Sequence, residues 1–167
     1  MKTARNLCLL VLAIFALGAA SAANASADTG SGAAMFTLSG GTPCPTDFRW
    51  DTGSSGGVPP SSGQSIDVGD FNPTGACAID VIDSGGEVDL NPGGTVSSVG
   101  GIDFDIDAGL FGSCEYAGSV SGTWTSTPDA NGNLIDMSGT ATRIAGSPFC
   151  PSPVSFTITA QSFTPDP

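Results

Sequence analysis

Hydrophobic and polar side chains alternate along several short stretches of this chain. The clearest stretch is 102–107, in which Ile102, Phe104 and Ile106 share one parity and three aspartates share the other. Successive side chains of a β-strand point to opposite faces, so this stretch is predicted to be a strand with one buried face. The same reasoning predicts strands at residues 35–38, 77–82, 88–90, 95–99, 114–124, 134–144 and 154–160.

Polar segments rich in Gly, Pro, Asn and Asp separate these stretches. Residues 91–94 read Asn-Pro-Gly-Gly and residues 127–132 read Thr-Pro-Asp-Ala-Asn-Gly, which are typical turn sequences. Residues 53–65 are mainly Gly, Ser and Pro and predict a longer loop. Short alternating strands with frequent turns predict an all-β fold, either an antiparallel β-sandwich or a barrel, of the immunoglobulin-like or jelly-roll-like kind.

The beginning of the chain has a different pattern. Lys2 and Arg5 precede an apolar stretch at residues 7–18, and small residues that suit signal-peptidase cleavage follow it. This order is typical of a secretory signal peptide, and the apolar stretch is too short to span a bilayer as a helix. We therefore expect residues 1–27 to be a leader, and the mature protein to be secreted to the extracellular space, the cell surface or the periplasm.

The remaining chain is expected to form one domain. Residues 28–34 are rich in Gly and Ala and are predicted to be a flexible N-terminus. Residues 35–162 are predicted to be a single β domain, and residues 163–167 a frayed C-terminus. No later apolar segment approaches the roughly 18 residues of a membrane-spanning helix, so no transmembrane span is expected.

Charge and composition exclude several functions. The chain has 16 Asp+Glu, 4 Lys+Arg and no His. Removal of the leader leaves Arg49 and Arg143 as the only basic residues, for a net charge of 2 − 16 = −14. Nucleic-acid binding is not expected, because phosphate neutralisation needs Lys and Arg. The mature chain has neither His nor Lys to activate a serine nucleophile, so we expect no enzymatic activity and no cofactor.

Four cysteines follow the leader, at Cys44, Cys77, Cys114 and Cys150. An even number of cysteines in an exported chain predicts two disulfides, and the lack of a Cys-x-x-Cys pair disfavours a zinc site. The residues leave the pairing open. A nested arrangement joins 44 to 150 and 77 to 114, whereas a sequential arrangement joins 44 to 77 and 114 to 150.

The three aspartates of the clearest strand are candidate metal ligands. Asp103, Asp105 and Asp107 lie on one strand face, with neighbours about 7 Å apart. Their carboxylates repel one another unless water solvates them or a hard cation such as calcium lies among them. The favoured interpretation is a hydrated outer face, and a calcium site is the alternative.

Aromatic residues are candidates for an apolar or glycan ligand. We consider Trp50, Trp124 and Tyr116 for this role. Tyr116 and Trp124 share strand parity with Val120, which favours a place in the core. Trp50 precedes the Gly- and Ser-rich loop and is the aromatic residue most readily placed near a surface.

Residues 114–124 read Cys-Glu-Tyr-Ala-Gly-Ser-Val-Ser-Gly-Thr-Trp, and a polar turn, a Ser- and Thr-rich strand and then Cys150 follow them. Together with Gly-Ala-Cys at 75–77, this layout resembles the PraB-type secreted activators of alkane oxidation. The chain departs from that family in its stronger acidity and in its Asp-, Gly- and Pro-rich first half. The resemblance implies an extracellular or surface role in the use of long-chain alkanes, and it carries over no catalytic residue.

The sequence therefore predicts an exported, non-enzymatic β-protein that assists the use of hydrophobic, alkane-type substrates. The alternative is a structural subunit of a surface layer, a biofilm matrix or a fibre. Such a subunit would self-associate through unpaired strand edges, with calcium screening its acidic face.

Overall fold

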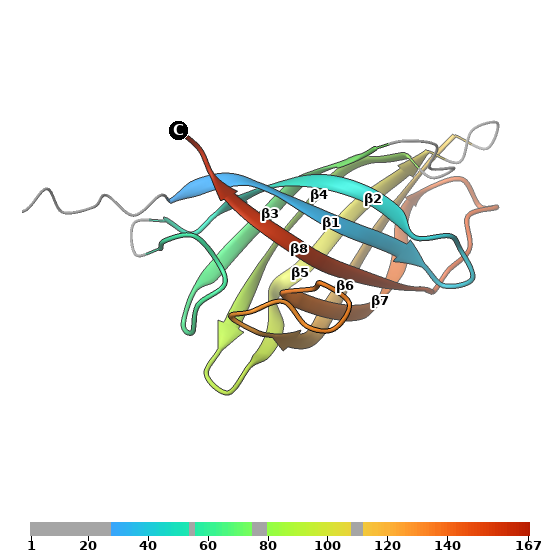
Figure 1. Ribbon diagram of the computed structural model, residues 1–167. Helices are drawn as coiled ribbons and strands as arrows, with labels where there is room; N and C mark the ends of the chain where they lie inside the picture. Colours follow the sequence, from blue (N-terminus) through green and yellow to red (C-terminus); the bar gives the residue numbers. More distant parts are fainter. Residues whose placement is uncertain (1–27, 54–55, 75–79, 108–111) are drawn as a thin grey trace, which may run out of the picture.

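Eight antiparallel strands close into a barrel (Figure 1). The computed structural model describes residues 28–53, 56–74, 80–107 and 112–167, and for residues 80–84 it describes the backbone only. The leader, Cys77 and residues 108–111 lie outside the described residues. The strands are β1 (Thr29–Leu38), β2 (Cys44–Asp51), β3 (Ser65–Pro73), β4 (Asp80–Asn91), β5 (Thr95–Asp107), β6 (Ser113–Trp124), β7 (Ile135–Gly146) and β8 (Val154–Pro165).

The strands follow one another around the barrel in chain order, and β8 pairs with β1 to close it. This confirms the all-β antiparallel fold and one of its two predicted architectures. The immunoglobulin-like, jelly-roll-like and sandwich expectations are corrected, because those folds pack two sheets joined by Greek-key connections, whereas here every strand pairs with its neighbour in sequence. No helix in the described part of the chain is long and apolar enough to cross a membrane.

The barrel begins earlier in the chain than the sequence indicated. Residues 29–34, predicted to be flexible, belong to β1 and pair with both β2 and β8. Gly30 and Gly32 face the interior, where the rings of Trp50 and Phe48 occupy the space that a Cβ atom would need. The glycines of β1 thus make room for two large aromatic rings.

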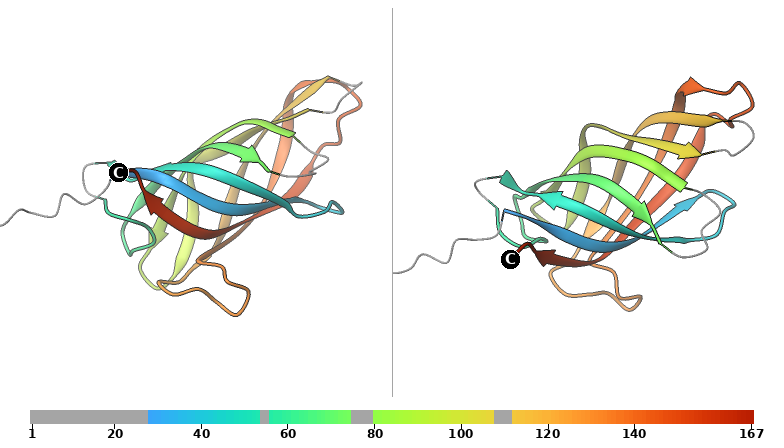
Figure 2. Two further views of the ribbon diagram at one scale, coloured as in Figure 1. Left: turned by 45° about the horizontal axis from the view of Figure 1, so that its top comes forward. Right: turned by 90° about the horizontal axis from the view of Figure 1, so that it is seen from above.

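The barrel also continues closer to the C-terminus than expected. Strand β8 runs to Pro165, so most of the predicted frayed end at 163–167 is ordered. The ring of Phe163 packs edge-on against that of Phe48, with centroids 5.5 Å apart. The backbone N–H of Asp166 donates to the carbonyl oxygen of Thr29 at 3.0 Å, which brings the two ends of the described chain together (Figure 2).

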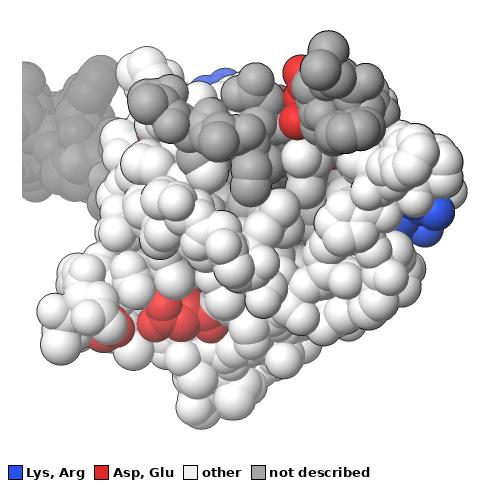
Figure 3. Space-filling model, turned by 90° about the vertical axis from the view of Figure 1, so that its right-hand side faces the viewer, with Lys and Arg blue, Asp and Glu red and all other residues white. Residues whose placement is uncertain are grey.

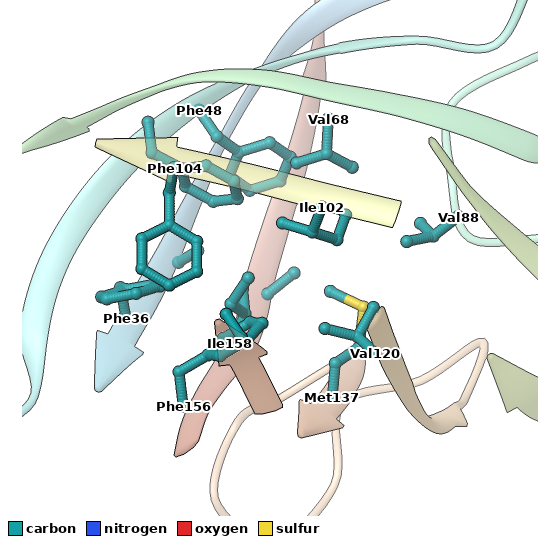
Figure 4. Packing of buried hydrophobic residues seen from close by; sticks show 14 of the residues in the cluster. Phe36, Phe48, Val68, Val88, Ile102, Phe104, Val120, Met137, Phe156 and Ile158 are labelled. Carbon is teal, nitrogen blue, oxygen red and sulfur yellow. The ribbon is translucent and has the colours of Figure 1, made fainter. Parts of the chain in front are cut away.

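The interior is a packed apolar core to which all eight strands contribute (Figure 4). Phe104 lies at the centre of an aromatic group, with its ring centroid 5.4 Å from Phe36, 5.3 Å from Tyr116 and 5.0 Å from Phe156. A residual cavity beside Phe48 has room for about one water molecule, about 10 Å³. An eight-stranded barrel is just wide enough for its own side chains to fill. The described part of the interior is therefore a packed core, and the cavity beside Phe48 is far too small for an alkane chain.

Candidate interaction site at the disulfide end of the barrel

The aromatic residues proposed from the sequence do not form an exposed ligand-binding face. Trp50 and Tyr116 point into the barrel and are 2% and 1% exposed. The Nε1–H of Trp50 donates to the carbonyl oxygen of Ser31 at 3.0 Å, which satisfies its polar atom. Trp124 is partly buried against the core, and its Nε1–H donates to the carbonyl oxygen of Asn91 at 2.9 Å. The expectation that Trp50 lies near a surface is corrected, because its parity with Phe48 places both rings inside.

The three aspartates of β5 lie on the outside of the barrel, while Ile102, Phe104 and Ile106 point inward. Asp105 stands directly opposite Glu115 of β6 in the register. Like charges in that position repel, and water at the surface reduces the repulsion. Among the described residues no group of three or more acidic, Cys or His side chains is arranged to hold a metal ion. The calcium site stays a prediction.

The most exposed large hydrophobic residues lie at one end of the barrel. Phe149 is 78% exposed and Ile144 is 56% exposed. Ile144 is near the end of β7, and Phe149 belongs to the connection from β7 to β8. Figure 3 looks onto this end, and most of its described surface is uncharged, in contrast to the acidic composition of the chain. Neither residue is among the ligand-binding candidates predicted from the sequence, although an apolar residue inside a Pro-rich turn segment was an available clue.

A disulfide fixes the loop that carries Phe149. Cys114, at the beginning of β6, is bonded to Cys150, and the two Cα atoms are 6.1 Å apart. This bond excludes the nested pairing and is one of the two bonds of the sequential pairing. Cys44 is 2% exposed and is not a free thiol. Because Cys77 lies outside the described residues, the second predicted disulfide stays a prediction.

Three partly buried hydrogen bonds, from Arg143 and Tyr116, also hold the same loop. The Nη1–H groups of Arg143 donate to the carbonyl oxygens of Ser147 at 2.7 Å and Cys150 at 3.1 Å. The hydroxyl of Tyr116 donates to the carbonyl oxygen of Pro151 at 3.0 Å. The loop is therefore anchored on both sides of Phe149, at Ser147, Cys150 and Pro151, and Phe149 has little conformational freedom to lose on contact with a partner.

Tyr116 should make stability depend on pH in the alkaline range. Burial raises the pKa of its phenol above the ordinary 10.0, and the positive charge of Arg143 offsets part of that rise. As pH rises, the unfolded chain loses the Tyr116 proton before the folded protein does. The contribution of Tyr116 to the free energy of unfolding is therefore complete below about pH 10 and is lost as pH rises through the pKa of the folded state. Urea unfolding at about pH 8 and about pH 11 should show this loss.

The matched variant is Tyr116→Phe, which cannot ionise. At neutral pH it should lower the free energy of unfolding by about 1 kcal/mol, because the bond to Pro151 is lost. Its free energy of unfolding should then fall less at alkaline pH than that of the unmodified protein. The chain has one Tyr, so tyrosinate absorbance follows this group directly. An equal alkaline loss in both proteins would contradict the assignment.

The fold defines an up-and-down barrel of eight strands with a filled apolar interior and, at one end, an anchored loop that exposes Phe149. Comparison of the chain with protein-family models, curated proteins and solved structures finds no match. The resemblance of residues 114–124 to the PraB-type activators stays a prediction.

Proposed function

We propose that this chain is an exported, non-enzymatic protein that assists the use of hydrophobic, alkane-type substrates by contacting the surface of apolar material. The observation that carries the proposal is the exposed pair Phe149 and Ile144 on an anchored, largely uncharged end of an acidic protein. The contact is made by the end of the barrel, and the packed interior takes no part in it.

The physical basis is burial of apolar surface. Transfer of a side chain such as Phe or Ile from water into hydrocarbon is favourable by about 1.5–3 kcal/mol. The remaining surface of the protein is acidic and stays hydrated. Adsorption would therefore be reversible and would orient the molecule with its disulfide end toward the hydrocarbon.

Adsorption to hexadecane droplets in water tests the proposal. The unmodified protein is expected to deplete from the aqueous phase as droplet area increases. The double variant Phe149→Ser/Ile144→Ser should adsorb more weakly by about tenfold or more, because two apolar contacts are lost. The matched control is Val58→Ser, at a residue 44% exposed in the connection between β2 and β3 at the other end of the barrel. This control should adsorb like the unmodified protein.

Two results would count against the proposal. The first is an unmodified protein that stays in the aqueous phase, and the second is a double variant that adsorbs as well as the unmodified protein. Thermal unfolding of each variant checks that the fold is retained.

The structural-subunit alternative has less support. Each of the eight strands has a partner on both sides, so growth by strand addition finds no wholly unpaired strand among the described residues. Light scattering of the droplet-free samples, with calcium and then with chelator, distinguishes the two. Calcium-dependent oligomers would favour the structural subunit.

A further inference from the structure

A hollow lies on the outside of the barrel, across β7, β8 and β1, which are side by side in the sheet (Figure 1). Its volume is about 540 Å³. Six hydroxyl groups line it, those of Thr37, Ser39, Ser138, Thr140, Ser155 and Thr157. This groove is separate from the exposed loop that carries Phe149.

The hydroxyls of the groove form a regular grid. Thr157 of β8 stands opposite Thr37 of β1 on one side and opposite Ser138 of β7 on the other. Ser155 stands opposite Thr140 in the next row. Neighbouring strands are about 4.8 Å apart, and side chains on one face of a strand repeat about every 7 Å. The sheet therefore offers hydroxyls in rows at fixed spacings.

These hydroxyls are available to a ligand. None of the six makes a side-chain hydrogen bond to another described residue, although several other Ser and Thr side chains do. For example, the Oγ of Ser98 accepts from the backbone N–H of Val120, and the Oγ of Ser152 accepts from that of Arg143. Each hydroxyl can both donate and accept, which is the property that recognition of another hydroxyl requires.

The groove is also neutral. No charged residue lines it, although the chain carries 16 acidic residues. Threonine methyl groups and the partly buried Leu38 supply apolar atoms among the hydroxyls. A sugar ring combines hydroxyl edges with apolar C–H faces, and it matches a surface of this mixed kind.

We propose that the groove across β7, β8 and β1 binds a neutral polysaccharide chain. The inference goes beyond the proposed contact with apolar material, because it rests on a different face and on different residues. Failure of either proposal leaves the other intact, since a variant of one surface keeps the other surface unchanged.

Titration calorimetry with neutral hexasaccharides of glucose, mannose and N-acetylglucosamine tests the inference. The purified protein is expected to bind at least one of them. The double variant Thr140→Val/Thr157→Val keeps the branched shape of both side chains and removes both hydroxyls. It should raise the dissociation constant of that ligand by about tenfold, the loss expected for two exposed hydrogen bonds.

Two variants serve as controls. Thr95→Val removes an exposed hydroxyl at the start of β5, outside the groove, and should bind like the unmodified protein. Phe149→Ser should also bind like the unmodified protein, because the exposed loop takes no part. No binding of any neutral hexasaccharide would overturn the inference, as would equal binding by the Thr140→Val/Thr157→Val variant. Equally tight binding of an anionic alginate hexasaccharide would overturn the neutral specificity.

Discussion

Replacement of Phe104 by alanine should lower the free energy of unfolding by about 3–5 kcal/mol. Phe104 is 2% exposed, and its ring lies between those of Phe36, Tyr116 and Phe156. Removal of the ring takes away the apolar area that it buries and three ring contacts. Because the strands of a closed barrel are held by hydrogen bonds on both sides, they cannot move inward to fill the space, and a cavity should remain.

Urea unfolding followed by Trp fluorescence measures this loss. The matched control is Val99→Ala on the same strand, at a residue that is 43% exposed, and its effect should stay within about 0.5 kcal/mol. A loss for Phe104→Ala that is no larger than that of the control would show that the aromatic group is not the centre of the core. If the variant does not fold, Phe104→Leu gives a smaller loss that remains measurable.

Removal of the disulfide between Cys114 and Cys150 should have a comparable effect. The bonded residues are 36 apart in sequence, and closing a loop of that length in the unfolded chain contributes about 3–4 kcal/mol. The double variant Cys114→Ala/Cys150→Ala should therefore unfold at lower urea concentration. It should also adsorb more weakly to hexadecane, because the loop that presents Phe149 loses one of its anchors.

Two controls distinguish a loss of global stability from a loss of order in the loop that carries Phe149. Limited proteolysis should cleave the variant within residues 146–153 sooner than the unmodified protein, at urea concentrations where both remain folded. The Tyr116→Phe variant keeps the disulfide and should be cleaved at an intermediate rate. A change in the free energy of unfolding below about 1 kcal/mol would contradict the assigned role of the bond.

The sequence was informative where the chemical contrast between the two strand faces is strong. Residues 102–107 were predicted correctly because Ile and Phe alternate with Asp. Strand β2 was not predicted, although its buried and exposed residues alternate without interruption, because its second residue is Pro45 and because a buried position is taken by the polar Thr46. The hydroxyl of Thr46 donates to the carbonyl oxygen of Ala34, a contact that only strand pairing creates.

The ends of the domain and the candidate site depend on contacts between distant segments. Residues 28–34 contain the glycines that usually indicate flexibility, and their place in β1 follows from the rings of β2 that lie over them. The buried position of Trp50 on β2 depends on the same contact, because its ring lies over Gly30 of β1. The exposure of Phe149 follows from the bond of its neighbour Cys150 to β6, and the sequence left that pairing open.

The pairing of the first strand with the last also determines when the protein can fold. Strand β1 pairs with β8 along almost its whole length, from Gly30 opposite Pro165 to Leu38 opposite Phe156. This edge of β1 stays unpaired until β8 has been synthesised. Contacts between such distant segments make folding slow, typically over milliseconds to seconds. Until β8 is available, β1 and β7 each expose a row of unpaired backbone groups that can pair with another chain. Strand β8 thus protects the protein from aggregation by covering the edges of β1 and β7. A chain truncated before β8 would associate with its copies instead of forming a smaller barrel.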